Sequence, residues 1–266
     1  MNRISRSMKR KVFTVLAVLV LAALVFLYAP IGLPGPYHGN SSTIGEIKAP
    51  SGYERIAGDD PKYTEYLRSI PLKDNGTPVM KYTAEKASAA TQARSYAVLD
   101  IALLSNAEQC ADAAMHLRAD YLFRTGQYGK ICFHNYAGLP MKYLGGRSGA
   151  AFKAYLRSVF NTCNTTTLVN SLENRDLKDI QPGDAFIYKV RPGHKYGHAI
   201  MVVDVAENPK NGKRMFLLAE GSTPACDIHI LRNLGRRSSP WFYVDGKSDS
   251  FLLTVFTFHK DELWHF

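Results

Sequence analysis

The sequence predicts an α+β fold: a single domain in which N-terminal helices pack on an antiparallel sheet, preceded by one N-terminal transmembrane helix. Residues 12–29 form an apolar run of nearly bilayer length. Over residues 60–69, 107–123 and 150–160, apolar residues recur at helical spacing. From Pro182 to about Phe258 the period changes to two, with turn residues between the runs. Helices that precede strands along the chain are typical of an α+β domain.

The N-terminal segment combines a basic flank, residues 1–11, with the apolar run Val12–Ala29. An apolar helix of roughly 20 residues spans a bilayer, whereas signal-peptide cores usually have about 7–15 residues. Because Pro30 follows at once and no small-x-small cleavage site stands out, we expect an uncleaved anchor, with a cleaved signal as the alternative. The basic flank predicts a cytoplasmic N-terminus. The domain would then lie in the periplasm of a single-pass inner-membrane protein, or be secreted if the signal is cleaved.

The net charge of +10 does not indicate a nucleic-acid partner. Five of the basic residues lie in the N-terminal flank, and the rest of the chain has 28 basic and 23 acidic residues. That part shows no dense basic run with interleaved aromatic residues. We therefore expect no nucleic-acid partner and interpret the remaining charge as a solvated surface.

The remaining chain divides into a tether and a domain. Residues 30–50 are rich in proline and glycine, which indicates a linker, and we expect the domain over residues 51–266. A short helix is predicted over residues 60–69, ended by Ile70-Pro71. Another helix is predicted over residues 150–160, where the aromatic and aliphatic residues form one stripe.

A longer helix is predicted over Ala107–Phe123. Ser105 with Glu108 three residues later is a capping-box signature, so we expect the helix to start near Asn106. Cys110 would then lie four or five residues inside the helix, on its apolar stripe. Free cysteine is often simply buried, but a thiol near a helix N-terminus and an imidazole can act as a nucleophile.

A glycine and a histidine open a predicted strand. On that strand His198 shares one face with Ile200, Val202 and Asp204, and the other face is uniformly apolar. If the following hairpin is centred on Pro209, Glu220 lies directly opposite His198. A carboxylate at this place could orient the imidazole and stabilise its charged form. Centring the turn on Asn211-Gly212 would shift the register and break the pairing.

The other candidate residues have weaker signals. Gln109 precedes the cysteine and could donate to an oxyanion, as could the backbone amides near Cys110. Proline and glycine next to His194 argue against a helical zinc pair with His198, so we expect no metal and no cofactor. Export would place the four cysteines in an oxidising compartment, and Cys132 and Cys163 are the expected disulfide partners.

Two family resemblances extend this interpretation. Residues 180–187, which include Gln181-Pro182-Gly183-Asp184, and residues 197–203 resemble the histidine region of NlpC-type and CHAP-type papain-like cell-wall hydrolases. That resemblance implies a papain-like domain in which Cys110, His198 and Glu220 occupy the catalytic positions, although Cys110 lacks the usual Asp-Cys entry to its helix. Over most of its length the chain also resembles a family of exported bacterial proteins known as a domain of unknown function. The matching segments are residues 109–112, 117–122, 197–199 and 217–220.

The expected function is therefore that of a membrane-anchored extracytoplasmic thiol hydrolase, a cysteine peptidase or amidase. Its substrate would be an amide bond, in cell-wall peptide or another peptide-like molecule. Two alternatives remain open: a catalytically inactive envelope module that binds peptide or glycan on the same fold, and a structural envelope protein in which Cys110 is buried. The reactivity of the thiol separates the first function from the other two.

Overall fold

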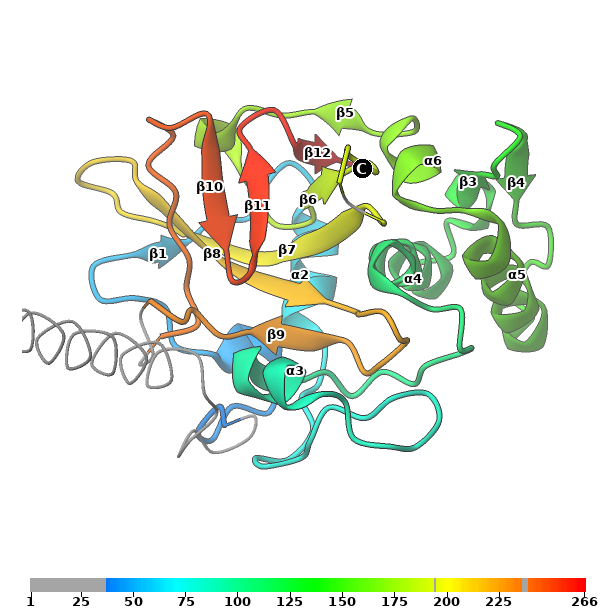
Figure 1. The fold of residues 1–266 in the computed structure, drawn as a ribbon, viewed down its shortest axis with the longest axis horizontal. Coiled ribbons are helices and arrows are strands. Elements are labelled where there is room, and N and C mark those ends of the chain that lie inside the picture. Colours follow the sequence, from blue (N-terminus) through cyan, green and yellow to red (C-terminus); the bar gives the residue numbers. More distant parts are fainter. Residues whose placement is uncertain (1–36, 194, 236–238) are drawn as a thin grey trace, which may run out of the picture.

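The computed structural model describes residues 37–193, 195–235 and 239–266. Over these residues the chain forms a mixed α+β domain with antiparallel sheets, as predicted (Figure 1). No helix in this described part is long and apolar enough to cross a membrane. The predicted span at residues 12–29 lies outside the described residues.

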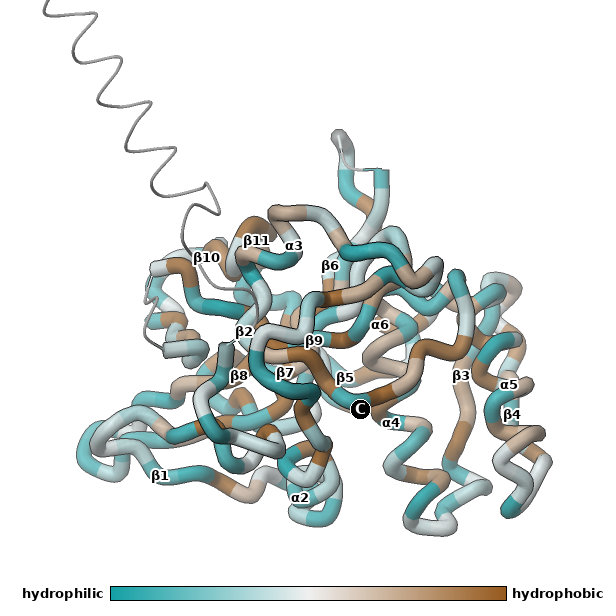
Figure 2. Tube along the Cα trace, turned by 90° about the horizontal axis from the view of Figure 1, so that it is seen from below, coloured by the Kyte–Doolittle hydropathy of each residue, from teal (hydrophilic) through white to brown (hydrophobic). Residues whose placement is uncertain are grey.

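The main sheet contains eight strands within the described ranges. Seven of them are ordered β2 (Ser95–Val98), β9 (His229–Leu231), β8 (Arg214–Glu220), β7 (His198–Glu207), β6 (Ala185–Tyr188), β12 (Leu263–His265) and β5 (Glu173–Asn174), and β1 (Glu54–Arg55) pairs with β7. Neighbouring strands are antiparallel. The strands β6, β7 and β8 are buried over nearly their whole length, and Figure 2 shows hydrophobic segments running through the middle of the molecule.

Each face of this sheet is covered by a different layer. One face packs against helices α2 (Pro61–Ser69) and α4 (Cys110–Arg124) in the larger core, and α5 (Gly149–Thr162) and α6 (Thr165–Val169) add to that layer. The other face is covered by the hairpin of β10 (Ser250–Leu253) and β11 (Phe256–His259). The smaller elements are η1 (Ile44–Glu46), α3 (Ala89–Arg94), η2 (Tyr128–Lys130), the hairpin of β3 (Cys132–His134) and β4 (Pro140–Lys142), and η3 (Leu177–Asp179).

Local signals place two of the predicted helices correctly. Asp60 caps α2 by accepting a hydrogen bond from the Tyr63 amide at 3.0 Å, and the helix ends before Ile70-Pro71. Ser148 caps α5 in the same way. Ile44 and Ile47, from the segment expected to be a linker, are buried in the larger core, so the folded domain extends into that segment.

The predicted start of the central helix is wrong. Helix α4 begins at Cys110, with Gln109 as its N-cap, and not near Asn106. Glu108 cannot complete the expected capping box because its carboxylate binds elsewhere. One oxygen accepts from the Leu104 amide at 2.7 Å, and the other lies 2.6 Å from His116 Nδ1. Asp112, three residues after the N-cap, completes the capping box instead: its carboxylate accepts a hydrogen bond from the Gln109 amide at 2.9 Å.

The predicted register of the β7–β8 hairpin is also wrong, because β7 contains a bulge. Near the turn Glu207 pairs with Arg214, and beyond the bulge Val202 pairs with Leu218, leaving Val203 as the extra residue. A one-residue slip moves all later side chains to the opposite face. The bulge therefore turns Glu220 to the same face as His198.

The bulge also changes the predicted strand faces. Val205, expected opposite to Ile200 and Val202, lies with them in the smaller core. Asp204, expected on the His198 face, points toward the helices instead, where it binds Arg55 and Arg68. Its carboxylate accepts from the two arginine Nε atoms at 2.6 and 2.8 Å. Asp204 is thus a buried structural ion-pair residue.

Candidate active site

Cys110 is the first residue of α4, which places its thiol at the end of the helix where backbone N–H groups lack acceptors. The partial positive charge of a helix N-terminus stabilises an anion nearby, and a thiolate is such an anion. Gly221, just after β8, allows the sheet to approach this helix end closely. A Cβ atom at Gly221 would lie 3.0 Å from the Gln109 carbonyl oxygen and 3.1 Å from Ala113 Cβ.

His198 is the first residue of β7 and is only 7% exposed. The preceding residue, Gly197, has no room for a side chain. A Cβ there would lie 2.3 Å from Thr165 Oγ1 and 2.5 Å from the Tyr188 carbonyl oxygen. The ring of Phe256, from β11, stacks on the imidazole with the ring centroids 3.7 Å apart. The imidazole is therefore held in place and shielded from solvent on one side.

The imidazole of His198 interacts with both Cys110 and Glu220. Its Nε2 atom lies 3.0 Å from Glu220 Oε2, so the contact predicted from the sequence is present, although the register that suggested it is not. Since Glu220 lies opposite the Ile200 position, the pair is diagonal rather than directly opposite. Burial lowers the pKa of His198, but hydrogen bonding to Cys110 and Glu220 outweighs this effect and raises the pKa to about 9.

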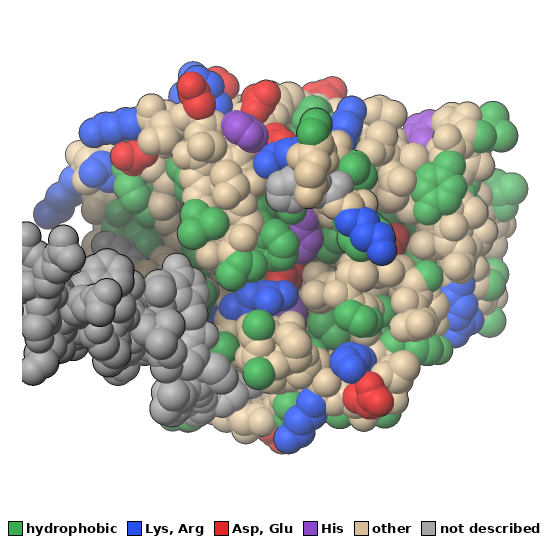
Figure 3. All heavy atoms as spheres, in the orientation of Figure 1, with side chains coloured by type: hydrophobic (Ala, Val, Ile, Leu, Met, Phe, Trp, Pro, Cys, Tyr) green, Lys and Arg blue, Asp and Glu red, His purple; other side chains and the backbone are tan. Residues whose placement is uncertain are grey.

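Glu220 is buried, and its carboxylate lies close to several cationic or protonatable side chains. Arg94 Nε donates to its Oε1 atom at 2.9 Å, and His229 Nε2 lies 3.6 Å from the same oxygen. Burial opposes ionisation of this carboxyl, but its contacts with His198 and His229 hold its pKa well below the usual range. Figure 3 shows acidic, basic and histidine side chains together near the middle of this face, among hydrophobic side chains.

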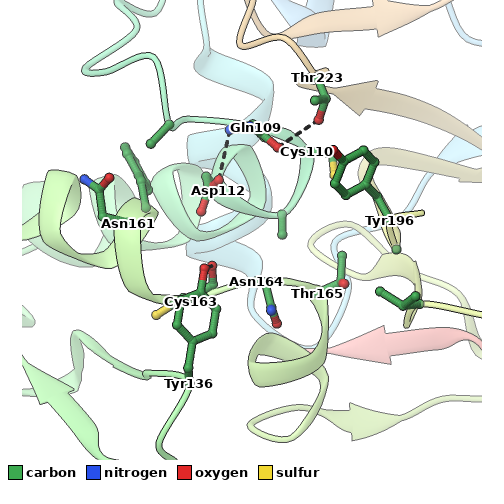
Figure 4. Close-up of a pocket in the computed structure, with 15 residues that line it drawn as sticks. Gln109, Cys110, Asp112, Tyr136, Asn161, Cys163, Asn164, Thr165, Tyr196 and Thr223 are labelled. Carbon is green, nitrogen blue, oxygen red and sulfur yellow. Dashed lines mark hydrogen bonds between the residues drawn. The ribbon is translucent and has the colours of Figure 1, made fainter.

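A pocket of about 350 Å³ opens beside Cys110. Figure 4 shows Tyr196 and Thr223 on the Cys110 side of this pocket and Tyr136, Cys163 and Asn164 on the opposite side. The lining includes several neutral polar side chains and one carboxyl, that of Asp112. The Oδ1 atom of Asp112 is buried without a hydrogen-bond partner in the described part of the chain. Burial raises the pKa of this carboxyl to about 8.

The remaining predicted residues have other roles. Gln109 lines the pocket and accepts a hydrogen bond from the Thr223 hydroxyl at 2.9 Å. The four cysteines are all free thiols, so the expected disulfide between Cys132 and Cys163 is not formed. Cys163 is buried in the larger core, and its thiol contacts the Met141 sulfur. Within the described ranges no group of three or more His, Cys, Asp or Glu side chains is arranged to hold a metal ion.

Comparison with known protein families identifies the family of this chain. A family model described as a domain of unknown function, DUF4846, matches residues 44–150 and 145–265. The chain belongs to this family. No curated protein and no solved structure matches the chain. Membership in DUF4846 bears out the resemblance to a domain of unknown function and assigns no activity, so the activity has to be inferred from the site.

In this DUF4846 domain, sequence reasoning missed the residues that surround the Glu220 and His198 pair. Arg94 is the last residue of α3, His229 opens β9 and Phe256 opens β11. His229 pairs with Glu220 from the strand that follows β8, whereas Arg94 and Phe256 reach the site from elements distant in the sequence. His229 carries a local signal that could have been used, because a histidine within an apolar strand needs a polar partner.

Proposed function

We propose that the domain is a thiol hydrolase that cleaves an amide bond, with Cys110 as the nucleophile, His198 as the base and Glu220 as the residue that orients His198. The observation that carries the proposal is the position of His198, which interacts with the thiol of a helix N-terminal cysteine and with a buried carboxylate. A nucleophile, a base and a group that orients the base are the parts that such catalysis requires.

The proposed mechanism uses both ring nitrogens of His198. Because Nε2 faces Glu220, Nδ1 is the nitrogen that takes the thiol proton of Cys110. The thiolate attacks the carbonyl carbon, the amide C–N bond breaks, and the proton on Nδ1 passes to the departing nitrogen. Water then attacks the thioester and gives its proton to Nδ1, and that proton returns to the sulfur as the acid is released.

The start of α4 supplies donors for the negative oxygen that forms in each attack. The backbone N–H groups of Cys110 and Ala111 belong to the first turn, where no intrahelical acceptor exists. The Gln109 amide lies beside them in the same pocket. Preorganised donors of this kind stabilise an oxyanion by about 3–4 kcal/mol each. We propose the two backbone groups as the principal donors and the Gln109 Nε2 group as an additional one.

The substrate proposal is a peptide-like molecule of the cell wall. The order of the parts supports a papain-like arrangement: a helix that begins with the cysteine, a strand that begins with Gly197-His198, and a next strand that ends with Glu220. The pocket beside Cys110 has room for a residue on one side of the scissile bond. Together with the basic flank and apolar run of the N-terminal segment, this supports a membrane-anchored enzyme that acts outside the cytoplasm.

The test compares the alkylation of two thiols in the same protein. Cys110 and Cys132 are both partly exposed. The Cys110 thiol interacts with His198, whereas the hydrogen bond of the Cys132 thiol goes to the Phe133 carbonyl oxygen. At about pH 6 we expect iodoacetamide to modify Cys110 at least about tenfold faster than Cys132, because the thiolate is the reactive form. Equal rates would contradict the proposal and favour the binding-module alternative.

Activity itself is tested by digestion of purified peptidoglycan, with the products identified by mass spectrometry. Cys110→Ser should abolish the release of peptide fragments, because a serine hydroxyl is far harder to deprotonate than a thiol. The matched variant Cys132→Ser should retain it. If the wild-type protein binds peptidoglycan and releases nothing while Cys110 is hyper-reactive, the substrate assignment fails and the thiol chemistry stands.

A further inference from the structure

A second imidazole, that of His229, lies behind Glu220 and has no part in the mechanism above. His229 is fully buried and pairs directly with Glu220 across β8 and β9. Its Nε2 atom is 3.6 Å from Glu220 Oε1. The carboxylate of Glu220 therefore lies between two histidines, with His198 on Oε2 and His229 on Oε1.

The surroundings of His229 determine which of its nitrogens carry protons. Nδ1 lies 2.9 Å from the carbonyl oxygen of Asp227, which can only accept, so Nδ1 is protonated. Nε2 has no hydrogen-bond partner among the described residues, and Glu220 Oε1, 3.6 Å away, is a charge neighbour that favours a proton there. The Cys226 thiol contacts the same ring. Burial lowers the pKa of His229, but the contacts with Cys226 and Glu220 outweigh it and raise the pKa to about 9.

The second partner on the same side of Glu220 is Arg94. Its Nε atom donates to Oε1 at 2.9 Å, and its guanidinium lies over the Phe256 ring, 6.0 Å from the centroid. Phe256 in turn stacks on His198. Since Arg94 donates to Oε1 and the charge of His229 lies nearest the same oxygen, Oε2 is the oxygen that faces His198. Val98, which pairs with His229 from β2, is apolar and adds no charge.

We propose that His229 is a positioning residue of this site: as a cation hydrogen-bonded to the Asp227 carbonyl, it holds Glu220 ionised and turned toward His198. Its action on Cys110 passes through Glu220 and His198, so the consequence for catalysis rests on the proposed function. The claim that His229 is charged does not depend on the proposed function, because it is argued from the contacts of the His229 ring alone. These two parts are tested separately.

The first experiment needs no substitution. The imidazole ¹⁵N shifts of His229 in the full chain, labelled at histidine and held in detergent micelles, report whether each ring nitrogen carries a proton. At about pH 7 we expect both nitrogens of His229 to be protonated, with loss of a proton only as the pH approaches 9. A neutral His229 ring at about pH 7 would overturn the inference, whatever the activity of the protein.

The second experiment removes the charge. His229→Gln keeps an N–H donor, and His116→Gln makes the same change at a buried histidine that pairs with Glu108 at 2.6 Å. We expect His229→Gln to lower the alkylation rate of Cys110 at about pH 6 by about tenfold and to shift the titration of His198 down by about one unit. His116→Gln should leave both unchanged.

The outcomes separate the two proposals. If Cys110 of the wild-type chain is no more reactive than Cys132, the proposed function fails, and the ¹⁵N measurement still decides the charge of His229. If wild-type Cys110 is hyper-reactive and His229→Gln leaves it so in a folded protein, the positioning role is refuted. A merely structural role for His229 would lower the unfolding temperature without shifting the His198 titration. If His229→Gln does not fold, the wild-type ¹⁵N shifts decide.

Discussion

Replacing Glu220 by glutamine removes a charge while preserving size and a hydrogen-bonding side chain. In the wild type, Glu220 Oε2 lies 3.0 Å from His198 Nε2, and both side chains are buried. A hydrogen bond to a charged group contributes about 1.5–3 kcal/mol, against about 0.5–1.5 kcal/mol between neutral groups. The imidazolium of His198 should therefore lose about 1.5 kcal/mol of stabilisation in Glu220→Gln, which corresponds to about one pKa unit.

The pKa of His198, about 9 in the wild type, should accordingly move down toward its ordinary value of 6.5. An NMR titration of the His198 ring measures this shift directly. The thiolate–imidazolium pair loses the same free energy, so the alkylation rate of Cys110 at about pH 6 should fall about tenfold. The rate at Cys132 should not change, because that thiol lies on β3, where its hydrogen bond goes to the Phe133 carbonyl oxygen.

Glu108→Gln is the matched control, since Glu108 is also a buried glutamate that binds a histidine, His116. It should leave the His198 titration and the Cys110 alkylation rate unchanged. A folded Glu220→Gln protein whose His198 titrates as in the wild type would refute the reasoning that Glu220 stabilises the imidazolium. An equal fall in both variants would attribute the effect to a general loss of packing.

Three further predictions concern stability and topology. Gly197→Ala should reduce the free energy of unfolding by about 1–3 kcal/mol, measured by urea denaturation, because its Cβ would meet the Tyr188 carbonyl oxygen at 2.5 Å. Gly149→Ala, with no atom within 4 Å of the new Cβ, should not destabilise, and equal losses would count against the packing argument. The pKa of Asp112 is raised from 3.8 to about 8, so the folded state binds the extra proton and the wild type loses stability as the pH rises between these values. Asp112→Asn should therefore gain stability relative to the wild type over that range, by several kcal/mol, and a difference independent of pH would contradict the burial argument. A phosphatase fused to the C-terminus should be active in the periplasm if residues 12–29 form an anchor with the expected orientation; an active cytoplasmic reporter there would reverse the topology.

Several parts of the fold follow from local sequence signals. The helix at residues 61–69 and the helix at residues 149–162 were predicted within a residue or two, because the apolar stripe and the cap lie within the same short segment. The strand that begins with Gly197-His198 is another such case, since alternation and the glycine are both local. His198, one of the three candidate catalytic residues, is the first residue of that strand.

The geometry of the site depended on contacts between distant segments. Two capping boxes are possible at the start of α4. Glu108 binds His116 and does not complete the first, and Asp112 completes the second with Gln109 as the N-cap. As a result Cys110 is the first residue of the helix, whereas the sequence predicted it inside the helix. A capping motif read from sequence cannot show that its carboxylate has a stronger partner one or two turns further along the helix.

The position of Glu220 was likewise decided by tertiary structure. Counting residues around a turn predicted its contact with His198, but only the bulge at Val203 brings Glu220 to that face. Next to the bulge, Asp204 is drawn toward the helices by two arginines from β1 and α2. The sequence by itself determined which residues could carry the chemistry, because residue type and local periodicity are local properties. Only the tertiary structure decided their geometry and the charges around Glu220, because strand register and buried ion pairs are chosen by long-range contacts that compete with local preferences.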